Sequence, residues 1–308
     1  LSEVSGIGAK RREMLQELGI HGLNDLASAN PERLAVQMER FGEQHGDVAG
    51  ALVAQAMAQR DGLVERLDST LALPELQRAP GVLLYDIESD PDARHDFLHG
   101  FLRLPRQSDG RWDLAAATYH PLLVMAEHGE QRSWLRLQRL LSRYDGWPIL
   151  HYGETETLSL RRLAQRQGAS DAQLRRLKRR LVDVHARIRS HWRLPLSSYG
   201  LKSVAAWRGF RWSQAGVDGA RALLWWRQWL GEGPKRRGSR HGLAWIFRYN
   251  QDDCRATWAV AEWLLKEDDL LTTGPDTDQP TAGPCSTGWG FICMVSPSDP
   301  SRVSAARC

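Results

Sequence analysis

Gly81-Val-Leu-Leu-Tyr-Asp86-Ile-Glu88 is a short apolar stretch that ends in two acidic residues. Its apolar and β-branched residues predict a buried β-strand. Side chains alternate along a strand, so Asp86 and Glu88 share one face with Val82 and Leu84. Two carboxylates on one face repel each other and lose hydration, penalties that a hard divalent cation such as Mg²⁺ or Mn²⁺ removes. The alternative is a solvated strand end that carries two surface acids.

The composition of the 308-residue chain is that of a globular protein, with 42% hydrophobic and 25% charged residues and a formal net charge of +4. Its four cysteines form no CxxC pair, which argues against a zinc knuckle or a disulfide framework. No secretory signal or apolar run of membrane-spanning length is present, so we expect a soluble, cytoplasmic protein without a membrane partner. The chain begins at Leu1 rather than Met, and we interpret it as a fragment of something longer.

The first residues contain the glycine-rich segment Ser5-Gly6-Ile7-Gly8, which is followed by Lys10 and two arginines. The two glycines allow a tight turn whose backbone N–H groups offer a phosphate site at a helix N-terminus. The segment resembles a helix-hairpin-helix DNA-binding unit, and Gly6, Gly8 and Lys10 would then contact nucleic acid. The alternative is that the unit serves only for packing or protein contact.

Motifs and changes in composition divide the chain into four predicted regions. We expect the helix-hairpin-helix unit in a small all-α domain over 1–36, a helical connector over 37–79, a main domain over 80–268, and a disordered tail over 269–308, where Thr, Gly, Pro, Asp and Ser dominate.

The main domain alternates strand and helix patterns. After the Asp-x-Glu strand, we expect strands at 95–104 and 112–119, a helix around Trp134, a strand at 147–152 and a helix from about Glu154. Short turns between the first three strands indicate an antiparallel meander. The order predicts a mixed α/β fold with a mixed sheet flanked by helices.

Two further acidic positions lie in predicted helices. Glu156 stands in the first turn of its helix, four residues before Leu160, and should face the core, whereas Glu154 should face solvent. Tyr249 and Asp253 are four residues apart and share one helix face.

The helix that carries Tyr249 and Asp253 is expected to open at about Arg248 and to run to about Lys266. Asp252 should point elsewhere, to the surface or to the positive end of the helix dipole. Asn250 is a candidate to cap this helix or to reach the acidic site.

Positive charge is concentrated between Arg161 and Arg193, where eleven basic residues, Arg175 and Arg179 among them, face two acidic ones. A second cluster is Lys235-Arg236-Arg237 with Arg240. Such clusters suit a phosphate backbone, although a solvated helix face gives the same pattern.

Two other segments have competing interpretations. Lys202, in a short helix after Tyr199-Gly200, is expected either to reach a phosphate or to extend over the core. The tryptophan-rich helix at 223–230 is interpreted as core rather than as a base-stacking platform.

Asp86-x-Glu88, then Glu156, then Tyr249-x-x-x-Asp253, in this order and context, resemble the four-acid (DEDD) 3′–5′ exonucleases, a superfamily with a ribonuclease-H-like fold. The resemblance covers about 81–268. More narrowly, the chain resembles the C-terminal exonuclease-like domain of RecB-family nucleases, in which a helix-hairpin-helix unit separates an upstream nuclease domain from this one. The narrower match rests on Tyr199-Gly-Leu-Lys-Ser203, Gly209-Phe-Arg-Trp212 and Tyr249-Asn-Gln-Asp-Asp-Cys254, and it implies that the upstream domain is missing here.

The resemblance implies two-metal phosphodiester hydrolysis with two Mg²⁺ or Mn²⁺ ions. Asp86 would bridge both ions, Glu88 and Asp253 would complete the nucleophile-side ion, Glu156 would support the leaving-group-side ion, and Tyr249 would orient the attacking water. The substrate would be a single-stranded or frayed 3′ end, with DNA favoured over RNA.

The chain departs from the superfamily at Glu156, where the pattern has Asp. This departure keeps open an alternative function, a nucleic-acid-binding module with a degenerate nuclease site. A third possibility is a scaffold whose basic helices contact proteins.

Overall fold

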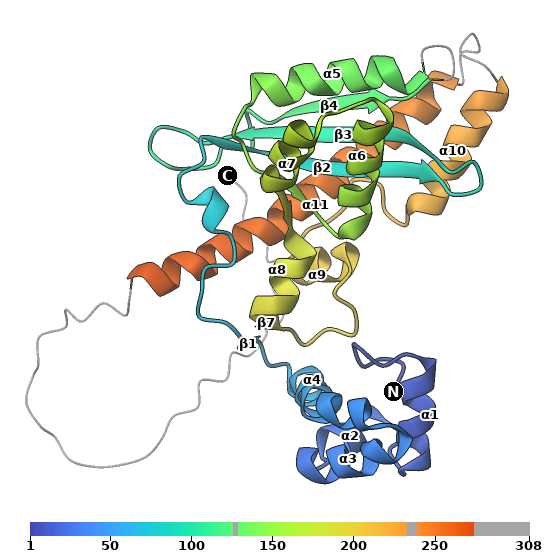
Figure 1. The fold of residues 1–308 in the computed structure, drawn as a ribbon, viewed down its shortest axis with the longest axis vertical. Helices are drawn as coiled ribbons and strands as arrows, with labels where there is room; N and C mark the ends of the chain where they lie inside the picture. Colours follow the sequence, from blue (N-terminus) through green and yellow to red (C-terminus); the bar gives the residue numbers. More distant parts are fainter. Residues whose placement is uncertain (126–128, 233–238, 274–308) are drawn as a thin grey trace, which may run out of the picture. The chain divides into compact units, whose positions relative to one another are not determined.

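The computed structural model describes residues 1–125, 129–232 and 239–273 (Figure 1). Four helices form the N-terminal region: α1 (Ala9–Glu17), α2 (Leu23–Ala27), α3 (Pro31–Met38) and α4 (Ala49–Asp61), with 3-10 turns at Glu39–Phe41 and Glu43–Val48. Pro31 occupies the first turn of α3, where its missing N–H costs nothing, and the Asn30 side chain caps that helix. The four helices share one apolar core, which includes Leu15, Leu26, Leu34, Met38 and Ala56.

A five-stranded mixed sheet is the centre of the main region. Its strands are β2 (Gly81–Asp90), β3 (His95–Pro105), β4 (Thr118–Leu123), β5 (Ile149–His151) and β6 (Leu181–Asp183), in the order β4-β3-β2-β5-β6. The β2–β3 and β3–β4 pairs are antiparallel, whereas β2–β5 and β5–β6 are parallel. The predicted meander and mixed α/β class are therefore confirmed, and β2 lies at the middle of the sheet.

The third strand is not where the sequence predicts it. Trp112 forms only an isolated bridge to Arg106, and β4 begins at Thr118. The Asp113 carboxylate accepts hydrogen bonds from the backbone amides of Ala115 and Ala116, which turns the chain away from an extended path. Pro121, which interrupts the apparent pattern, is tolerated because β4 is an edge strand.

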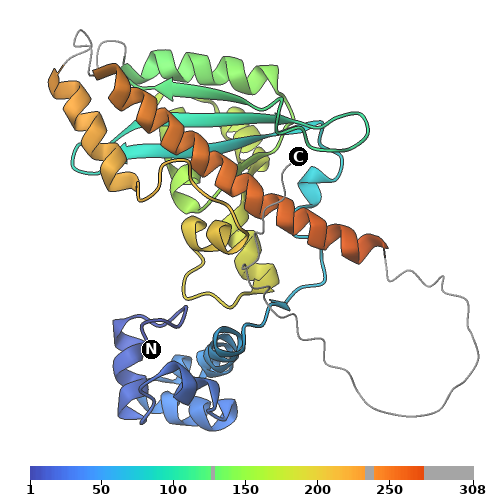
Figure 2. The same cartoon turned by 180° about the vertical axis from the view of Figure 1, so that it is seen from behind.

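Helices cover both faces of the sheet (Figures 1 and 2). On one face, Leu83 and Tyr85 pack with α5 (Gly129–Arg143), α6 (Glu154–Arg166) and α7 (Asp171–Arg180). On the other, Val82 and Leu84 pack with α8 (Val184–His191), α9 (Leu201–Trp207) and α11 (Ser239–Thr273). The alternation along β2 thus decides which helices each side chain meets.

Helix α11 is longer than predicted at both ends, since it begins at Ser239 rather than near Arg248 and runs to Thr273 rather than to about Lys266. Residues 269–273, predicted as the start of the disordered tail, are therefore helical. Tyr249 and Asp253 therefore lie inside the helix, whose path across the sheet is seen in Figure 2. Helix α10 (Gly219–Glu232) precedes it, and its Trp226 and Trp229 are buried near the start of β3, as the core interpretation requires. Leu224 and Leu230 of the same helix are exposed.

Near its C-terminal end, α11 contacts residues 65–76, the segment that precedes β2. The buried carboxylate of Asp268 accepts hydrogen bonds from the backbone amides of Ala72 and Leu73, both 2.9 Å long. It also forms an ion pair with Arg66 at 3.0 Å. That segment includes β1 (Glu65–Arg66), which pairs with β7 (Trp192–Arg193), and a 3-10 turn at Pro74–Leu76.

No helix among the described residues is both long and apolar enough to cross a membrane. Cys254 is free and buried. The other three cysteines, the Lys235–Arg237 cluster with the Arg240 side chain, and residues 274–308 of the predicted tail lie outside what the structure describes.

Candidate metal and active site

Three acidic side chains converge between β2 and α11. Oxygen atoms of Asp86, Glu88 and Asp253 all lie within 4.8 Å of one another. Glu88 and Asp253 are buried and Asp86 is half-buried. Asp86 and Glu88 meet on the α11 side of β2 because they have the same strand parity as Leu84. Carboxylate oxygens at this separation are the donor set that a hard divalent cation takes.

The electrostatics of this cluster favour a bound cation. Burial, and then the charges of Asp253 and Glu88, raise the pKa of Asp86 well above its usual value. Burial and Asp253 likewise raise the pKa of Glu88. Burial raises the pKa of Asp253 to about 6, although a hydrogen bond from Trp212 lowers it. Burial and mutual repulsion therefore disfavour the charged form of all three carboxylates, and a cation would compensate the same charges.

Asn250 is a site residue for which the sequence gives only an ambiguous indication. It is fully buried, and its amide Nδ2 donates to Asp86 Oδ2 at 2.7 Å and to Glu88 Oε1 at 3.4 Å. Its Oδ1 accepts from the Tyr119 hydroxyl at 2.8 Å, which fixes the orientation of the amide. Gly100 makes room for it, since a Cβ there would lie 1.6 Å from Asn250 Oδ1. Asn250 thus positions the two β2 carboxylates rather than capping a helix.

A loop between α9 and α10 also holds the acidic residues of α11. The Trp212 indole N–H donates to Asp253 Oδ1 at 2.6 Å. Ser213 donates from its amide and its hydroxyl to Asp252 Oδ2, at 2.8 and 2.6 Å. The prediction that Asp252 faces the surface or the helix dipole is therefore wrong: it is buried, within the helix, and it anchors the loop that brings Trp212 to Asp253.

Glu156 lies in the first turn of α6 and is buried, whereas Glu154 is exposed, as the helix periodicity predicts. It is not one of the three clustered acids. Its Oε2 is buried and has no hydrogen-bond partner among the described residues. Burial raises the pKa of Glu156 to about 7, with smaller contributions from Asp183 and Asp253. An unpartnered buried carboxylate oxygen is a candidate metal ligand.

A cleft of about 390 Å³ joins these groups. Asp86, Glu156 and Asp253 line it, together with Tyr249 and the start of α9 at 200–203. The hydroxyl of Tyr249 hydrogen-bonds Asp253, so the two residues share one helix face as predicted.

Lys202 is exposed and lines the same cleft. Its ammonium group donates to the Val217 carbonyl at 2.9 Å and lies 5.3 Å from the centre of the Tyr249 ring. Its positive charge also lowers the pKa of Glu88 and of Asp253. The cleft therefore combines acidic side chains with the positively charged ammonium group of Lys202.

The other residues predicted to bind nucleic acid lie away from the cleft. Arg175 and Arg179 are exposed on α7, which packs on the opposite face of the sheet. Gly6, Gly8 and Lys10 are exposed around the start of α1. The structure does not bring these two groups together with the acidic cluster.

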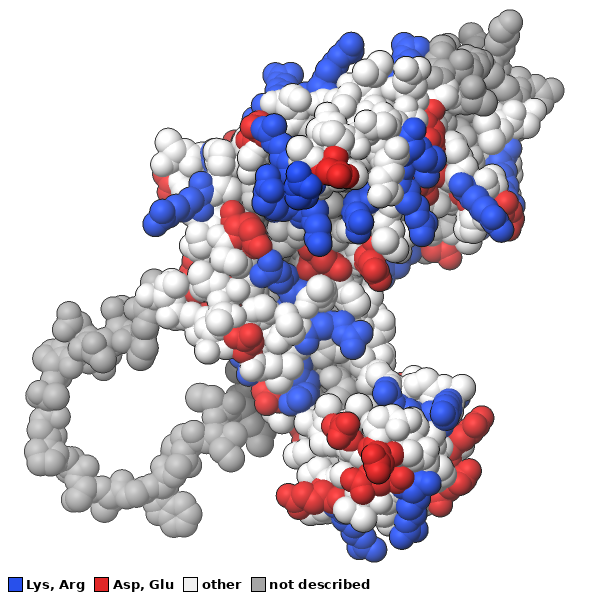
Figure 3. All heavy atoms as spheres, viewed as in Figure 1, with Lys and Arg blue, Asp and Glu red and all other residues white. Residues whose placement is uncertain are grey.

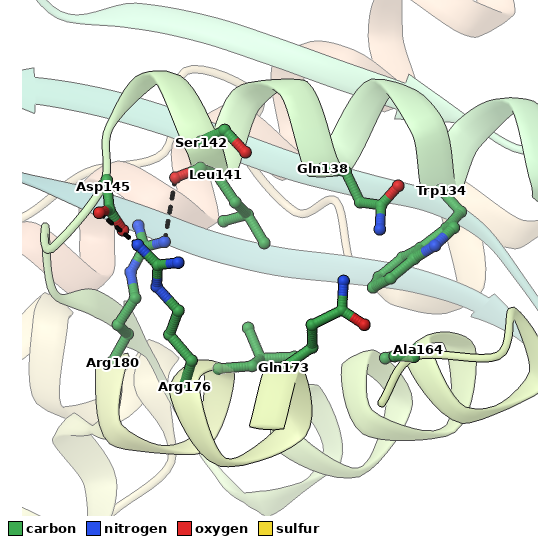
Figure 4. Close-up of a pocket in the computed structure, with 11 residues that line it drawn as sticks. Trp134, Gln138, Leu141, Ser142, Asp145, Ala164, Gln173, Arg176 and Arg180 are labelled. Atoms are coloured by element: carbon green, nitrogen blue, oxygen red, sulfur yellow. Dashed lines mark hydrogen bonds and ion pairs between the residues drawn. The ribbon is translucent and has the colours of Figure 1, made fainter. Parts of the chain in front are cut away.

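A larger cavity, of about 560 Å³, lies between α5, α6 and α7 (Figure 4). The side chains of Trp134, Gln138 and Leu141 point into it, and its one acid, Asp145, is paired with Arg176. It contains none of the clustered carboxylates, so it is not the reaction site.

A central strand with two acids, opposed by a third acid on α11, forms a candidate carboxylate metal site in a mixed sheet. A family model of the RNase H superfamily matches residues 83–265, and the chain belongs to that superfamily. The match includes all three clustered acids and does not extend to residues 1–82. No curated protein and no solved structure matched the chain. The predicted ribonuclease-H-like fold is thereby confirmed, and the family together with the acidic cluster indicates a hydrolytic, metal-binding nuclease.

Proposed function

We propose that the chain is a metal-dependent 3′–5′ exonuclease that hydrolyses phosphodiester bonds at the end of a single or frayed strand. The observation that carries the proposal is the convergence of Asp86, Glu88 and Asp253 within 4.8 Å at a cleft. These three residues would hold one Mg²⁺ or Mn²⁺ ion, and Asp86 with Glu156 would hold a second. Such ions, when bound, lower the pKa of coordinated water and compensate the negative charge of a phosphate.

The protein's own groups have distinct tasks in this proposal. Tyr249 keeps its proton at neutral pH, because burial and the charge of Asp253 raise its pKa, and its hydroxyl orients the attacking water. Lys202, at the cleft wall, supplies a positive charge to the phosphate. Asn250 holds Asp86 and Glu88 in the rotamers that face Asp253.

The substrate follows from the surroundings of the cleft. Lys202 at the cleft wall suits a phosphate, and exposed arginines such as Arg175 and Arg179 supply positive charge elsewhere on the domain. We further propose that residues 1–36 are a helix-hairpin-helix unit in which Gly6, Gly8 and Lys10 contact the phosphates of the nucleic acid. We also propose that the chain is related to the RecB-family nucleases. On this basis DNA is favoured over RNA.

The test is degradation of a 5′-labelled single-stranded DNA in Mn²⁺ by the wild type and by Asp86→Asn and Asp253→Asn variants. The expected result is a ladder that shortens from the 3′ end with the wild type and is absent with both variants. Glu154→Gln, which removes an exposed carboxylate two residues from Glu156, is the matched control and should cut like the wild type.

Two outcomes would contradict the proposal. If the wild type leaves DNA intact but retards it on a gel, the chain is a binding module. If the Asp86→Asn variant still cuts, the acidic cluster is not the reaction site.

A further inference from the structure

Helix α5 carries four arginines on one flank, Arg132, Arg136, Arg139 and Arg143, here called the α5 arginine stripe. Their spacing places them within about 60° of the helix circumference and over about 16 Å of its length. All four are exposed. Lysine and arginine side chains gather on the α5–α7 side of the domain in Figure 3. A basic row along one helix is the usual footprint of a nucleic-acid contact.

The stripe lacks acidic partners. The only acid within α5 is Glu130, which forms a 2.6 Å ion pair with Arg166 of α6. Asp145, which follows the helix, is paired with Arg176. Within the described parts of the chain, none of the four stripe arginines forms an ion pair. A solvated helix face usually intersperses both signs of charge, so four unpaired cations in a row require another explanation.

The stripe is the free flank of α5. The opposite flank, with Trp134, Gln138 and Leu141, faces the cavity towards α6 and α7 (Figure 4). Arg143 complements the helix dipole in the last turn, but the other three arginines lie too far from the C-terminus for that role.

The positive region continues onto β3, beside the end of α5. Arg103 of β3 lies 5.5 Å and Arg143 lies 5.7 Å from the centre of the Tyr144 ring, so two guanidinium groups share one aromatic partner. Burial and these two charges lower the pKa of His120 on β4. Such like charges are tolerated more easily when an anion binds near them.

The stripe and the cleft lie on different faces of the sheet. Helix α5 packs on the face of Leu83 and Tyr85, whereas Asp86 belongs to the α11 face. The same phosphate cannot contact both, so a nucleic acid on the stripe is a separate stretch from the strand end in the cleft.

We propose that the α5 arginine stripe binds the phosphate backbone of duplex nucleic acid outside the reaction cleft. Single-strand sites combine basic grooves with exposed aromatic rings, whereas the stripe offers guanidinium groups and its neighbouring Tyr144 ring is covered by two of them. Phosphate contacts of this kind position a duplex without reading its sequence. The inference rests on the proposed function for its context but concerns binding alone.

The test is fluorescence anisotropy of a labelled blunt DNA duplex in EDTA, where no hydrolysis occurs, at about 50 and about 200 mM salt. The variant is Arg136→Gln/Arg139→Gln. The matched control is Arg78→Gln/Arg255→Gln, which removes two other exposed arginines that form no ion pair in the described residues. Loss of two phosphate contacts should lower the slope of log affinity against log salt concentration by about 1.8 in magnitude. The ratio of wild-type to stripe-variant affinity should therefore be about twelvefold larger at the lower salt than at the higher salt.

Equal affinities and salt slopes for the stripe variant and the control would overturn the proposal, as would an equal loss on a single-stranded probe. Arg136→Lys/Arg139→Lys should restore much of the binding, because it keeps the charge. The Asp86→Asn variant has an intact stripe and should bind the duplex like the wild type. Absence of nuclease activity would therefore leave this inference standing, and absence of duplex binding would leave the nuclease proposal standing.

Discussion

Replacement of Asp253 by Asn should make the metal-free protein more stable at neutral and alkaline pH. Asn keeps the shape of the side chain and an Oδ1 acceptor for the Trp212 indole. Raising the pKa of Asp253 from 3.8 to about 6 in the fold corresponds to about 3 kcal/mol of destabilisation once the group is charged. Because the neighbouring acids share protons, we expect a gain of roughly 1–3 kcal/mol for the variant.

The direction with pH follows from proton linkage. The folded state holds a proton on Asp253 between pH 4 and 6 that the unfolded state releases, so wild-type stability falls as pH rises through this window. Below about pH 4 the group is protonated in both states, and the variant should equal the wild type. Above about pH 6 the variant should be the more stable protein.

The assay is urea unfolding at pH 4 and pH 8 in EDTA, repeated at pH 8 with Mn²⁺. A cation that binds only the folded state at a hundred times its dissociation constant adds about 2.7 kcal/mol. The wild type should gain this stability and the variant should not, so Mn²⁺ should shift the difference between the two proteins by about 2.7 kcal/mol in favour of the wild type. A variant that is less stable than the wild type in EDTA at pH 8, or equal stabilisation of both by Mn²⁺, would refute the reasoning.

Other substitutions test the surroundings of the cluster. Gly100→Ala should cost about 1–3 kcal/mol in urea unfolding, because its Cβ overlaps Asn250 Oδ1. Gly50→Ala, with open space around it, should be neutral or stabilising, and equal effects of the two substitutions would contradict the close packing. Lys202→Met removes a positive charge that lowers the pKa of Asp253 and of Glu88, so both values should rise in carboxyl NMR titrations of the metal-free protein. Unchanged values would show that the ammonium group lies elsewhere in solution. Glu156→Gln should remove proton uptake near pH 7 in the same titrations, and its persistence would assign that uptake to another group.

The sequence predicted the parts of the fold that depend on local periodicity. The apolar run from Gly81 and the spacing in α5 and α6 led to the correct elements, because their core-facing positions repeat at the period of a strand or a helix. The third strand was misplaced because Trp112 packs on Trp258 as a core side chain without belonging to the sheet. The start of α11 was missed because Gly242 interrupts the pattern and Leu243–Phe247 is a continuous apolar run, which periodicity alone does not assign to a helix.

The acidic cluster could be anticipated because strand parity and a four-residue helical spacing fix which side chains share a face. The side chains from distant segments that hydrogen-bond or pack against these acids and Asn250 could not be anticipated. The bond from Trp212 to Asp253 spans 41 residues, and the fit of Gly100 against Asn250 depends on the stacking of α11 over β3. Asp252 was misjudged for the same reason, since a buried acid beside an active-site acid is recognised only when the serine that binds it is seen.

The Asp268 contacts set the smallest piece of this chain that should fold as a stable unit. The superfamily match ends at residue 265, and the sheet begins at Gly81, so a truncation guided by either would separate Asp268 from Arg66, Ala72 and Leu73. Either cut would leave a buried carboxylate or two buried amides without partners. A minimal stable fragment should therefore begin before residue 66 and end after residue 268.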